Sequence, residues 1–168
     1  RPLLAAMYSA AITSIAEMGP QGLANTAWAF ATLGLPNASL FHAIGCAAVS
    51  TIAEFSQQNL ANIAWAFSAI EVFHTPLFEV IASPARIRCS EFLPQGIANI
   101  LWAFAHIAFS DVPLMDALAA ASISKISTFK SQNLVNTAWA MAKVRFVHAP
   151  LLQAISAPSL PCISYFDA

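Results

Sequence analysis

The chain repeats itself every 37 residues, and this period constrains its fold more than any other feature. The repeat is marked by a glutamine, an asparagine and a tryptophan in fixed order. They stand at Gln21, Asn25, Trp28, Gln58, Asn62, Trp65, Gln95, Asn99, Trp102, Gln132, Asn136 and Trp139. A Pro-Leu pair keeps the same phase at Pro2, Pro76, Pro113 and Pro150, and Ser39-Leu40 takes its place in the second unit. Since fixed periods of about 20–50 residues are typical of solenoids and repeat arrays, the sequence predicts an array of similar units.

The phase of the repeat divides the chain into units that we expect to form a single domain over residues 1–168. The units are 2–38, 39–75, 76–112, 113–149 and a partial fifth, 150–168. The hydrophobic spacing in each complete unit predicts two helices. In the first unit, the first of these helices is predicted to run from about Leu3 to Met18. Thr75 and Asp111 are the predicted N-caps of first helices. Ser56, Pro20 and Pro94 are predicted to begin second helices. We therefore predict an all-α solenoid of helix-turn-helix repeats.

The second helix of the first unit, "QGLANTAWAFATLG", contains no charged residue. Leu23, Ala27 and Phe30 form an apolar stripe at helical spacing, and Ala24 and Trp28 broaden it. So broad a stripe indicates a helix that is buried between its hairpin partner and the neighbouring repeats. We interpret the tryptophans as side chains that fill the space between repeats. The alternative is that they stack on bases or sugars.

The four repeated asparagines are polar groups in an apolar setting, so each needs a hydrogen-bond partner. One interpretation is that each asparagine bonds to a backbone carbonyl of the adjacent loop and fixes the geometry of the repeat. The other is that the four form a ladder along a ligand groove. Their identity in every unit favours the first, because a residue that reads a varied ligand should itself vary.

Prolines interrupt the predicted first helices in two places. Pro84 takes the place of Ala10, Ala47 and Ala121 of the other units, where a proline kinks or ends a helix. Pro158 has the same position in the fifth unit, and Pro161 follows it. We therefore expect a short last helix with an extended tail, "SLPCISYFDA", and further repeats or a partner beyond it.

The composition is apolar, with 58% hydrophobic and 9% charged residues, where globular proteins have roughly 25% charged residues. A solenoid with so few charges is expected to cover its surface with partners. The segment from Met18 to Ala53 carries no charge, but Gly19, Pro20, Gly34 and Pro36 interrupt it, so we expect no transmembrane span. Association with a membrane complex remains compatible with the sequence.

The three cysteines, Cys46, Cys89 and Cys162, are an odd number and stand at different places in their repeats. No CxxC or Cys/His ligand spacing accompanies them. Buried free thiols in a reducing compartment are the favoured interpretation.

The repeated residues carry a resemblance to a known class. The second helix resembles the consensus "QxLANxxWAFAxLG" of the 37-residue heptatricopeptide-type repeats and of the slightly longer octotricopeptide repeats of algal and protist organellar proteins. The matching residues are Gln21, Leu23, Ala24, Asn25, Trp28, Ala29, Phe30, Leu33 and Gly34. The resemblance covers four full copies. It implies a right-handed α-solenoid, a location in the chloroplast or mitochondrion, and single-stranded RNA binding in organellar gene expression.

Two repeat positions vary in polar character, as base-reading positions do in one-base-per-repeat recognition. The first holds Ala5, His42, Glu79, Asp116 and Gln153, and the second holds Thr32, Ala69, His106 and Lys143. The alternative is that these positions are exposed and free to drift. Residues 1–116 carry three basic and seven acidic side chains. Residues 117–168 carry one acidic side chain, Asp167, and four basic side chains, Lys125, Lys130, Lys143 and Arg145. Any phosphate contact is therefore expected at the last repeat.

The sequence thus leaves two classes of function open. We favour a non-catalytic scaffold, an accessory or structural subunit that binds other protein subunits of a larger organellar assembly. The alternative is a single-stranded RNA-binding repeat protein. Because no GxSxG, HExxH or phosphate-binding glycine loop occurs, we expect no catalytic site, cofactor or metal. The histidines, His42, His74, His106 and His148, are interpreted as satisfied or exposed side chains without metal spacing.

Overall fold

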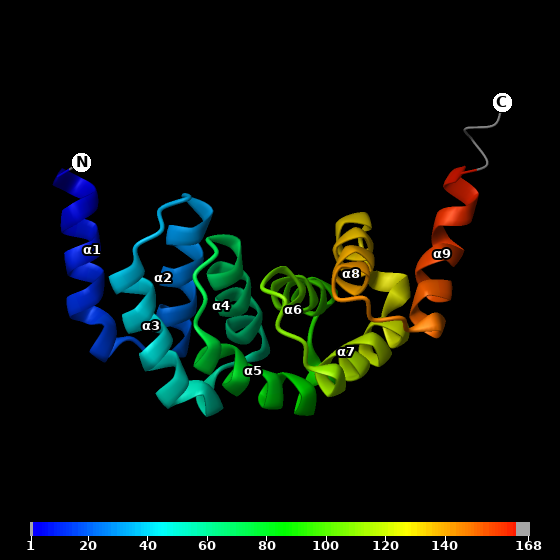
Figure 1. Ribbon diagram of the computed structural model, residues 1–168, viewed down its shortest axis with the longest axis horizontal. Helices are drawn as coiled ribbons and strands as arrows, with labels where there is room; N and C mark the ends of the chain where they lie inside the picture. Colours follow the sequence, from blue (N-terminus) through cyan, green and yellow to red (C-terminus); the bar gives the residue numbers. More distant parts are fainter. Residues whose placement is uncertain (1, 164–168) are drawn as a thin grey trace.

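The chain folds into a curved array of helical hairpins (Figure 1). The computed structural model describes residues 2–163, and side-chain surroundings for 3–157. Four hairpins follow one another, and α9 occupies the fifth unit. The helices are α1 Pro2–Ser14, α2 Pro20–Thr32, α3 Ala38–Thr51, α4 Gln57–Ala69, α5 Thr75–Ile87, α6 Pro94–His106, α7 Val112–Ser124, α8 Ser131–Lys143 and α9 Ala149–Ile163. The described residues contain no strand, and the predicted all-α solenoid is confirmed.

The first helix of each of the four hairpins is followed by one 3₁₀ turn, which tightens the chain before the second helix begins. These turns are η1 Ile15–Glu17, η2 Ile52–Glu54, η3 Cys89–Glu91 and η4 Ile126–Thr128. The helical stretch predicted up to Met18 therefore ends as a 3₁₀ turn at Glu17.

The helices form two rows, with α1, α3, α5, α7 and α9 on the outside of the curve and α2, α4, α6 and α8 on the inside (Figure 1). The inner helices pack on one another much more extensively than the outer helices do. Alanine stands at the same repeat position of α2, α4 and α6, at Ala24, Ala61 and Ala98, and all three are buried. Because alanine lets helices approach closely, the inner row is shorter than the outer row, and the array curves toward it.

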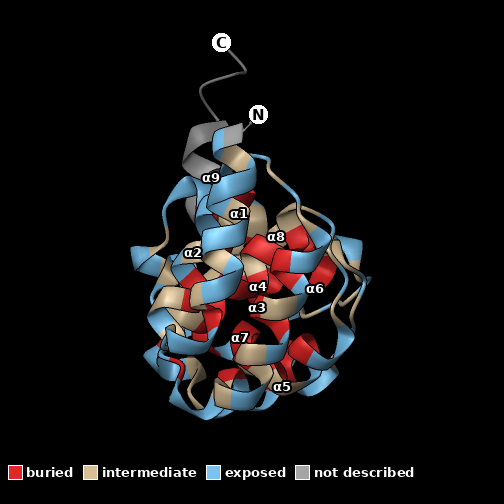
Figure 2. Cartoon of the chain, turned by 90° about the vertical axis from the view of Figure 1, so that its left-hand side faces the viewer, coloured by how far each residue is buried: buried red, intermediate tan, exposed pale blue. Residues whose placement is uncertain are grey.

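The apolar core lies between the two rows of helices, where the buried residues gather (Figure 2). One cluster of buried side chains runs from Ile15 to Ala140 through all four hairpins. Two edge-to-face phenylalanine pairs occupy its centre at the same repeat positions. Phe41 and Phe67 have ring centroids 5.1 Å apart, and Phe78 and Phe104 have centroids 5.3 Å apart. The core is therefore continuous along the array, and each hairpin packs on the next.

The N-caps of four outer helices also keep the 37-residue step. In each, a side chain accepts a hydrogen bond from the backbone N–H three residues later, and these residues are Asn37, His74, Asp111 and His148. The prediction for Asp111 is confirmed, as are the Ser56 cap of α4 and the proline starts of α2 and α6. The Thr75 prediction is wrong, because His74 is the N-cap of α5 and Thr75 is already the first helical residue.

The second residue after the end of each inner helix has a left-handed backbone conformation, and these residues are Gly34, Glu71, Ala108 and Arg145. Gly34 is the usual residue for this conformation, since it has no Cβ to clash. The backbone N–H after each of these residues bonds back to the carbonyl five residues earlier, as Leu35 does to Phe30 over 3.0 Å. This closure satisfies carbonyl groups at the helix end and turns the chain toward the next outer helix.

We expected the prolines to interrupt these helices, but neither helix ends at a proline. α5 continues past Pro84 to Ile87, and α9 continues through Pro158 and Pro161 to Ile163. A proline removes one backbone hydrogen bond, and helical geometry can persist on both sides of it. In α5 the fully buried Ala85 holds the last turn against the core. The expected short last helix is therefore wrong, and the tail residues 164–168 lie outside the described part of the chain.

Two basic side chains join successive hairpins by binding carbonyl groups of the preceding loop. Arg88 donates from Nη1 to the Phe55 carbonyl over 2.8 Å. Lys125, one repeat later, donates from Nζ to the carbonyls of Ser90 and Phe92 over 2.7 and 2.8 Å. The same repeat position in the second unit is Thr51, whose hydroxyl bonds within its own helix to Ala47. The link is therefore present at the second and third junctions and missing at the first.

None of the helices in the described part of the chain has the length and hydropathy needed to cross a bilayer.

The hydroxyl of Thr137 is fully buried in α8 and has no hydrogen-bond partner among the described residues. Its repeat position holds Ile63 and Ile100 in the two preceding units. Thr137→Val is therefore expected to raise the free energy of unfolding by about 1 kcal/mol, because it removes an unsatisfied buried polar group. Urea denaturation followed by circular dichroism measures the change. Thr26→Val is the matched control, since Thr26 has the same repeat position but its hydroxyl contacts the Met18 sulfur. A less stable Thr137→Val variant would contradict the prediction.

Candidate binding surface

The repeat signature forms one solvent-facing stripe on each inner helix. In α2, Leu23, Ala27 and Phe30 point into the core. At 100° per residue, Gln21, Asn25, Trp28 and Thr32 lie on the opposite side of the helix, and all four are exposed. Their counterparts complete the surface that we call the inner stripes: Gln58, Asn62, Trp65 and Ala69 on α4, Gln95, Asn99, Trp102 and His106 on α6, and Gln132, Asn136, Trp139 and Lys143 on α8. The stripes face away from the outer row, toward the inside of the curve.

The tryptophans of the inner stripes form a ladder across three helices. The ring centroids of Trp65 and Trp102 are 6.5 Å apart, and those of Trp102 and Trp139 are 6.1 Å apart with an interplanar angle of 29°. His106 stacks on Trp102 at 4.6 Å. Trp28 is 46% exposed and Trp139 is 39% exposed. The prediction that the tryptophans fill the space between repeats fits Trp65 and Trp102, which are half-buried and pack against the core cluster, whereas Trp28 and Trp139 at the two ends of the row are exposed.

The amide side chains of two neighbouring stripes line a groove between α4 and α6. It has a volume of about 380 Å³ and is lined by Gln58, Asn62, Gln95 and Asn99 on the two helices, with Glu91 and Phe92 at one end. Gln57, which also lines it, donates from its amide to the Glu91 carboxylate. Further along the array, Gln132 donates to the Asn136 side chain over 3.0 Å. In the described residues no repeated asparagine bonds to a loop carbonyl, contrary to the favoured interpretation, and the ladder of asparagines along a ligand groove stays a prediction.

The inner stripes carry little charge, and their one lysine lies at the C-terminal end of the array. The amino group of Lys143 lies 6.0 Å from the centre of the Trp139 ring, within range of a cation–π interaction. Arg145 and Lys130 are exposed near the two ends of the same helix, α8. Lys125 differs from these three, because its amino group is already bonded to two carbonyls. Three of the four basic residues predicted to contact phosphate are therefore open to solvent.

The candidate ligand residues of the first helices lie in the outer row. His42, Glu79, Asp116 and Gln153 are all exposed, on α3, α5, α7 and α9. They stay predicted ligand or partner contacts. The structure separates them from the inner stripes, which carry the second variable position at Thr32, Ala69, His106 and Lys143. Sequence reasoning missed the stripes as a surface, although the spacing i, i+4, i+7 and i+11 of their members marks one face of a helix.

The last inner helix, α8, leaves one apolar side open. Val135 has the repeat position of Ala24, Ala61 and Ala98, which are at most 2% exposed because each packs on the following inner helix. Val135 is 63% exposed. Ala142 is also exposed, although its counterparts Ala31, Ser68 and Ala105 are buried. This open side of α8 is a further apolar surface on the described part of the chain.

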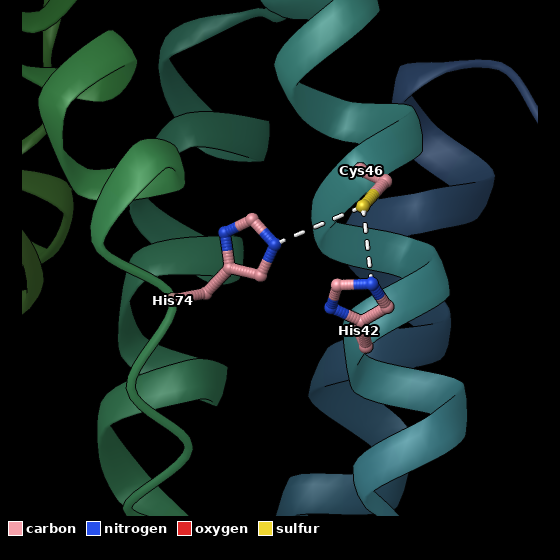
Figure 3. Close-up of side chains that lie close together, drawn as sticks. All are labelled: His42, Cys46 and His74. Carbon is pink, nitrogen blue, oxygen red and sulfur yellow. Dashed lines mark hydrogen bonds between the residues drawn. The ribbon is translucent and has the colours of Figure 1, made fainter.

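A cluster of two histidines and a cysteine lies outside the inner stripes, between α3 and the start of α5 (Figure 3). The Cys46 sulfur lies 3.7 Å from His42 Nε2 and 4.0 Å from His74 Nε2. Burial lowers the pKa of the His74 imidazole, and the nearby His42 lowers it further. The i, i+4 spacing of His42 and Cys46 was the available sequence signal, and the expectation of no metal spacing among the histidines overlooked it. Cys46 and Cys89 are free as expected, but neither is fully buried, because Cys46 is exposed and Cys89 is half-buried. The Cys162 side chain lies outside the described residues.

The fold and the inner stripes define a class: α-helical repeat proteins that present a recurring aromatic and amide face from each inner helix. Residues 3–168 match the RESC6 family, described as the RNA-editing substrate-binding complex 6 protein. The chain belongs to this family. No curated protein matches the chain.

Proposed function

We propose that this chain is a non-catalytic helical-repeat subunit of a larger organellar assembly that handles RNA. The observation that carries the proposal is the inner stripe, because Gln, Asn and Trp recur there at exposed or half-buried positions, opposite the core-facing residues of each inner helix. Stacked rings and amides suit binding, and His106 and Lys143 are the titratable side chains of the stripes within the described residues. The family description, which names an RNA-editing substrate-binding complex, supports membership of an assembly.

Two further parts of the proposal follow the resemblance of the repeats. We place the protein in an organelle, chloroplast or mitochondrion, because the second helix resembles organellar heptatricopeptide-type and octotricopeptide repeats. We also treat residues 1–168 as one solenoid domain, which the continuous core through four hairpins supports. The free thiols of Cys46 and Cys89 are compatible with a reducing compartment.

The open side of α8 is the surface that we assign to a neighbouring protein subunit. Val135 and Ala142 are small apolar side chains in places where the other inner helices contact one another. A partner helix that lies against α8, as α8 lies against α6, would bury them. Such a contact is apolar, as obligate interfaces are, and it fits the low charge of the chain.

Val135→Asp is expected to release the protein from its assembly. The tagged wild-type chain, expressed in its native cells, should fractionate well above its own mass of 17.9 kDa after nuclease treatment. The variant should fractionate near its own mass, because a carboxylate buried in an apolar contact is strongly unfavourable. Sedimentation of nuclease-treated extracts measures both.

Val147→Asp is the matched control, because Val147 is an exposed valine outside the open side of α8. It should leave the assembly intact. Both variants should unfold at the wild-type temperature, since neither valine is buried within the chain. A wild-type chain that fractionates at its own mass after nuclease treatment would contradict the scaffold proposal and favour association through RNA.

Direct contact with single-stranded RNA is the second candidate function, and the tryptophan ladder favours it. Successive bases can stack on aromatic side chains regardless of their sequence. The ladder from Trp65 to Trp139 ends beside Lys143, with Arg145 and Lys130 exposed on the same hairpin. Stacking surface and positive charge therefore meet at the C-terminal end of the inner row.

A further inference from the structure

The cluster of His42, Cys46 and His74 has the composition and spacing of a metal site. Their three ligand atoms all lie within 4.8 Å of one another. A tetrahedral zinc ion with ordinary Zn–S and Zn–N bonds places sulfur and nitrogen about 3.6 Å apart. The distances from the Cys46 sulfur to the two Nε2 atoms, 3.7 and 4.0 Å, are close to that value. Small rotamer changes would therefore bring the three atoms onto one ion.

The backbone of α3 leaves room for the His74 ring at Gly45. A Cβ atom at Gly45 would lie 2.6 Å from the Cδ2 atom of His74, which is too close for any real contact. Glycine at position 45 therefore lets the imidazole lie against α3 beside Cys46. The corresponding positions in the other units hold Tyr8, Ala82 and Ala119. Of the two capping histidines, only His74 has a glycine at this position, because His148 has Ala119 at the equivalent one.

The combination of ligands is also confined to this place in the array. The positions equivalent to His42, Cys46 and His74 hold Ala5, Ser9 and Asn37 one repeat earlier. One repeat later they hold Glu79, Ser83 and Asp111, and two repeats later Asp116, Ala120 and His148. The cluster is therefore not a by-product of the repeat, since every other junction lacks the cysteine and at least one of the histidines.

We propose that His42, Cys46 and His74 bind one zinc ion, which links α3 to the start of α5. A thiolate and two imidazoles are ligands that zinc prefers among the divalent ions. His42 and Cys46 present their ligand atoms from successive turns of one helix, as paired zinc ligands at i and i+4 do. Both are exposed, so water can occupy the fourth position. Binding releases the Cys46 thiol proton to solvent.

Zinc binding competes with the cap of α5. The Nδ1 atom of His74 now accepts a hydrogen bond from the Leu77 N–H over 3.3 Å. A neutral imidazole that binds a metal through Nε2 carries its proton on Nδ1, where it faces this N–H. The cap hydrogen bond must therefore open when zinc binds. The Leu77 amide, which also donates to the His74 carbonyl over 2.9 Å, then loses one of its two acceptors and so reports occupancy of the site.

The test is titration of the purified 168-residue chain with Zn²⁺ and with Co²⁺ under reducing conditions. We expect one equivalent of each metal to bind, with a thiolate-to-cobalt charge-transfer band, and faster hydrogen exchange at the Leu77 amide. Cys46→Ala should abolish the band. His42→Ala and His74→Asn should each weaken zinc binding at least about tenfold. Asn37 caps α3 at the position equivalent to His74, so His74→Asn removes the ligand and keeps the cap.

His148→Asn is the matched control, because it changes a capping histidine of the same kind outside the cluster. It should bind zinc like the wild-type chain. Gly45→Ala removes no ligand, but it should weaken binding by displacing the His74 ring. Absence of the charge-transfer band, wild-type affinity in Cys46→Ala, or equal losses in His74→Asn and His148→Asn would overturn the proposal and leave a thiol–imidazole contact only.

Discussion

Phe104→Ala is expected to lower the free energy of unfolding by about 3–5 kcal/mol. Phe104 is fully buried in α6 and lies edge-to-face with Phe78 at 5.3 Å and with Phe109 at 5.7 Å. Truncation leaves a cavity between the two rows of helices, where three rings now meet. Since each repeat is stabilised by its neighbours, the loss at the third unit also weakens the second and the fourth. Urea denaturation measured by circular dichroism gives the change.

Phe73→Ala serves as the control for this stability prediction. Phe73 is 69% exposed, so its removal should change the free energy of unfolding by less than about 0.5 kcal/mol. If the Phe104→Ala variant unfolded at the same urea concentration as Phe73→Ala, the phenylalanine pairs would not be the centre of the core.

The double variant Trp102→Ala and Trp139→Ala is expected to weaken RNA binding at least about thirtyfold, if the second candidate function holds. Each stacked base contributes about 1–3 kcal/mol, and the variant removes two adjacent steps of the ladder. Fluorescence anisotropy with short mixed-sequence single-stranded RNA, measured over a salt series, gives the affinities. Wild-type binding should fall with salt, because Lys143 and Arg145 lie at the same end of the array.

Two comparisons interpret this RNA measurement. Phe73→Ala removes an exposed ring outside the inner stripes and should bind RNA like the wild-type chain. Lys143→Glu with Arg145→Glu should abolish binding and leave the fold intact. Wild-type protein without salt-dependent RNA binding would exclude the RNA candidate, whereas full binding by the tryptophan variant would place the RNA elsewhere on the chain.

The fold was predictable because its information is local and repeated. A period of 37 residues fixed the units, and helical spacing within each unit fixed the two helices. Helix N-caps were predictable where a residue type with a strong capping preference stands at the start of the helix, as Asp111 and Ser56 do. Prediction was wrong where packing decided the outcome. Pro84 does not end α5, which continues to Ile87 with Ala85 buried in the core.

The direction of the tryptophans was not predictable from apolar character alone. Trp28 extends the apolar stripe of α2, so burial was expected, yet its angle around the helix places it opposite Leu23 and Phe30. The exposure of Trp28 shows that the glutamines, asparagines and tryptophans belong to one face. Apolar residues on that face can contact a ligand. A count of hydrophobic residues in the sequence does not distinguish them from the apolar residues of the core.

The His42, Cys46 and His74 cluster could not be assembled from the sequence, although two of its members stand one helical turn apart. His74 joins them from the loop before the next outer helix, 28 residues after Cys46. Such a distance is set by how consecutive outer helices lie against each other. It also depends on Gly45, whose missing side chain has meaning only once the position of the His74 ring is known.

The basic links between hairpins make the array unevenly stiff. Arg88 and Lys125 each bind carbonyls of the preceding loop, while Thr51 at the first junction bonds only within its own helix. Among the described residues, no side-chain hydrogen bond joins α1 or α2 to α3 or α4, whereas such bonds reinforce the apolar packing at the second and third junctions. An inner surface built on such a frame can change its curvature at the N-terminal end while the tryptophan ladder at the other end keeps its spacing.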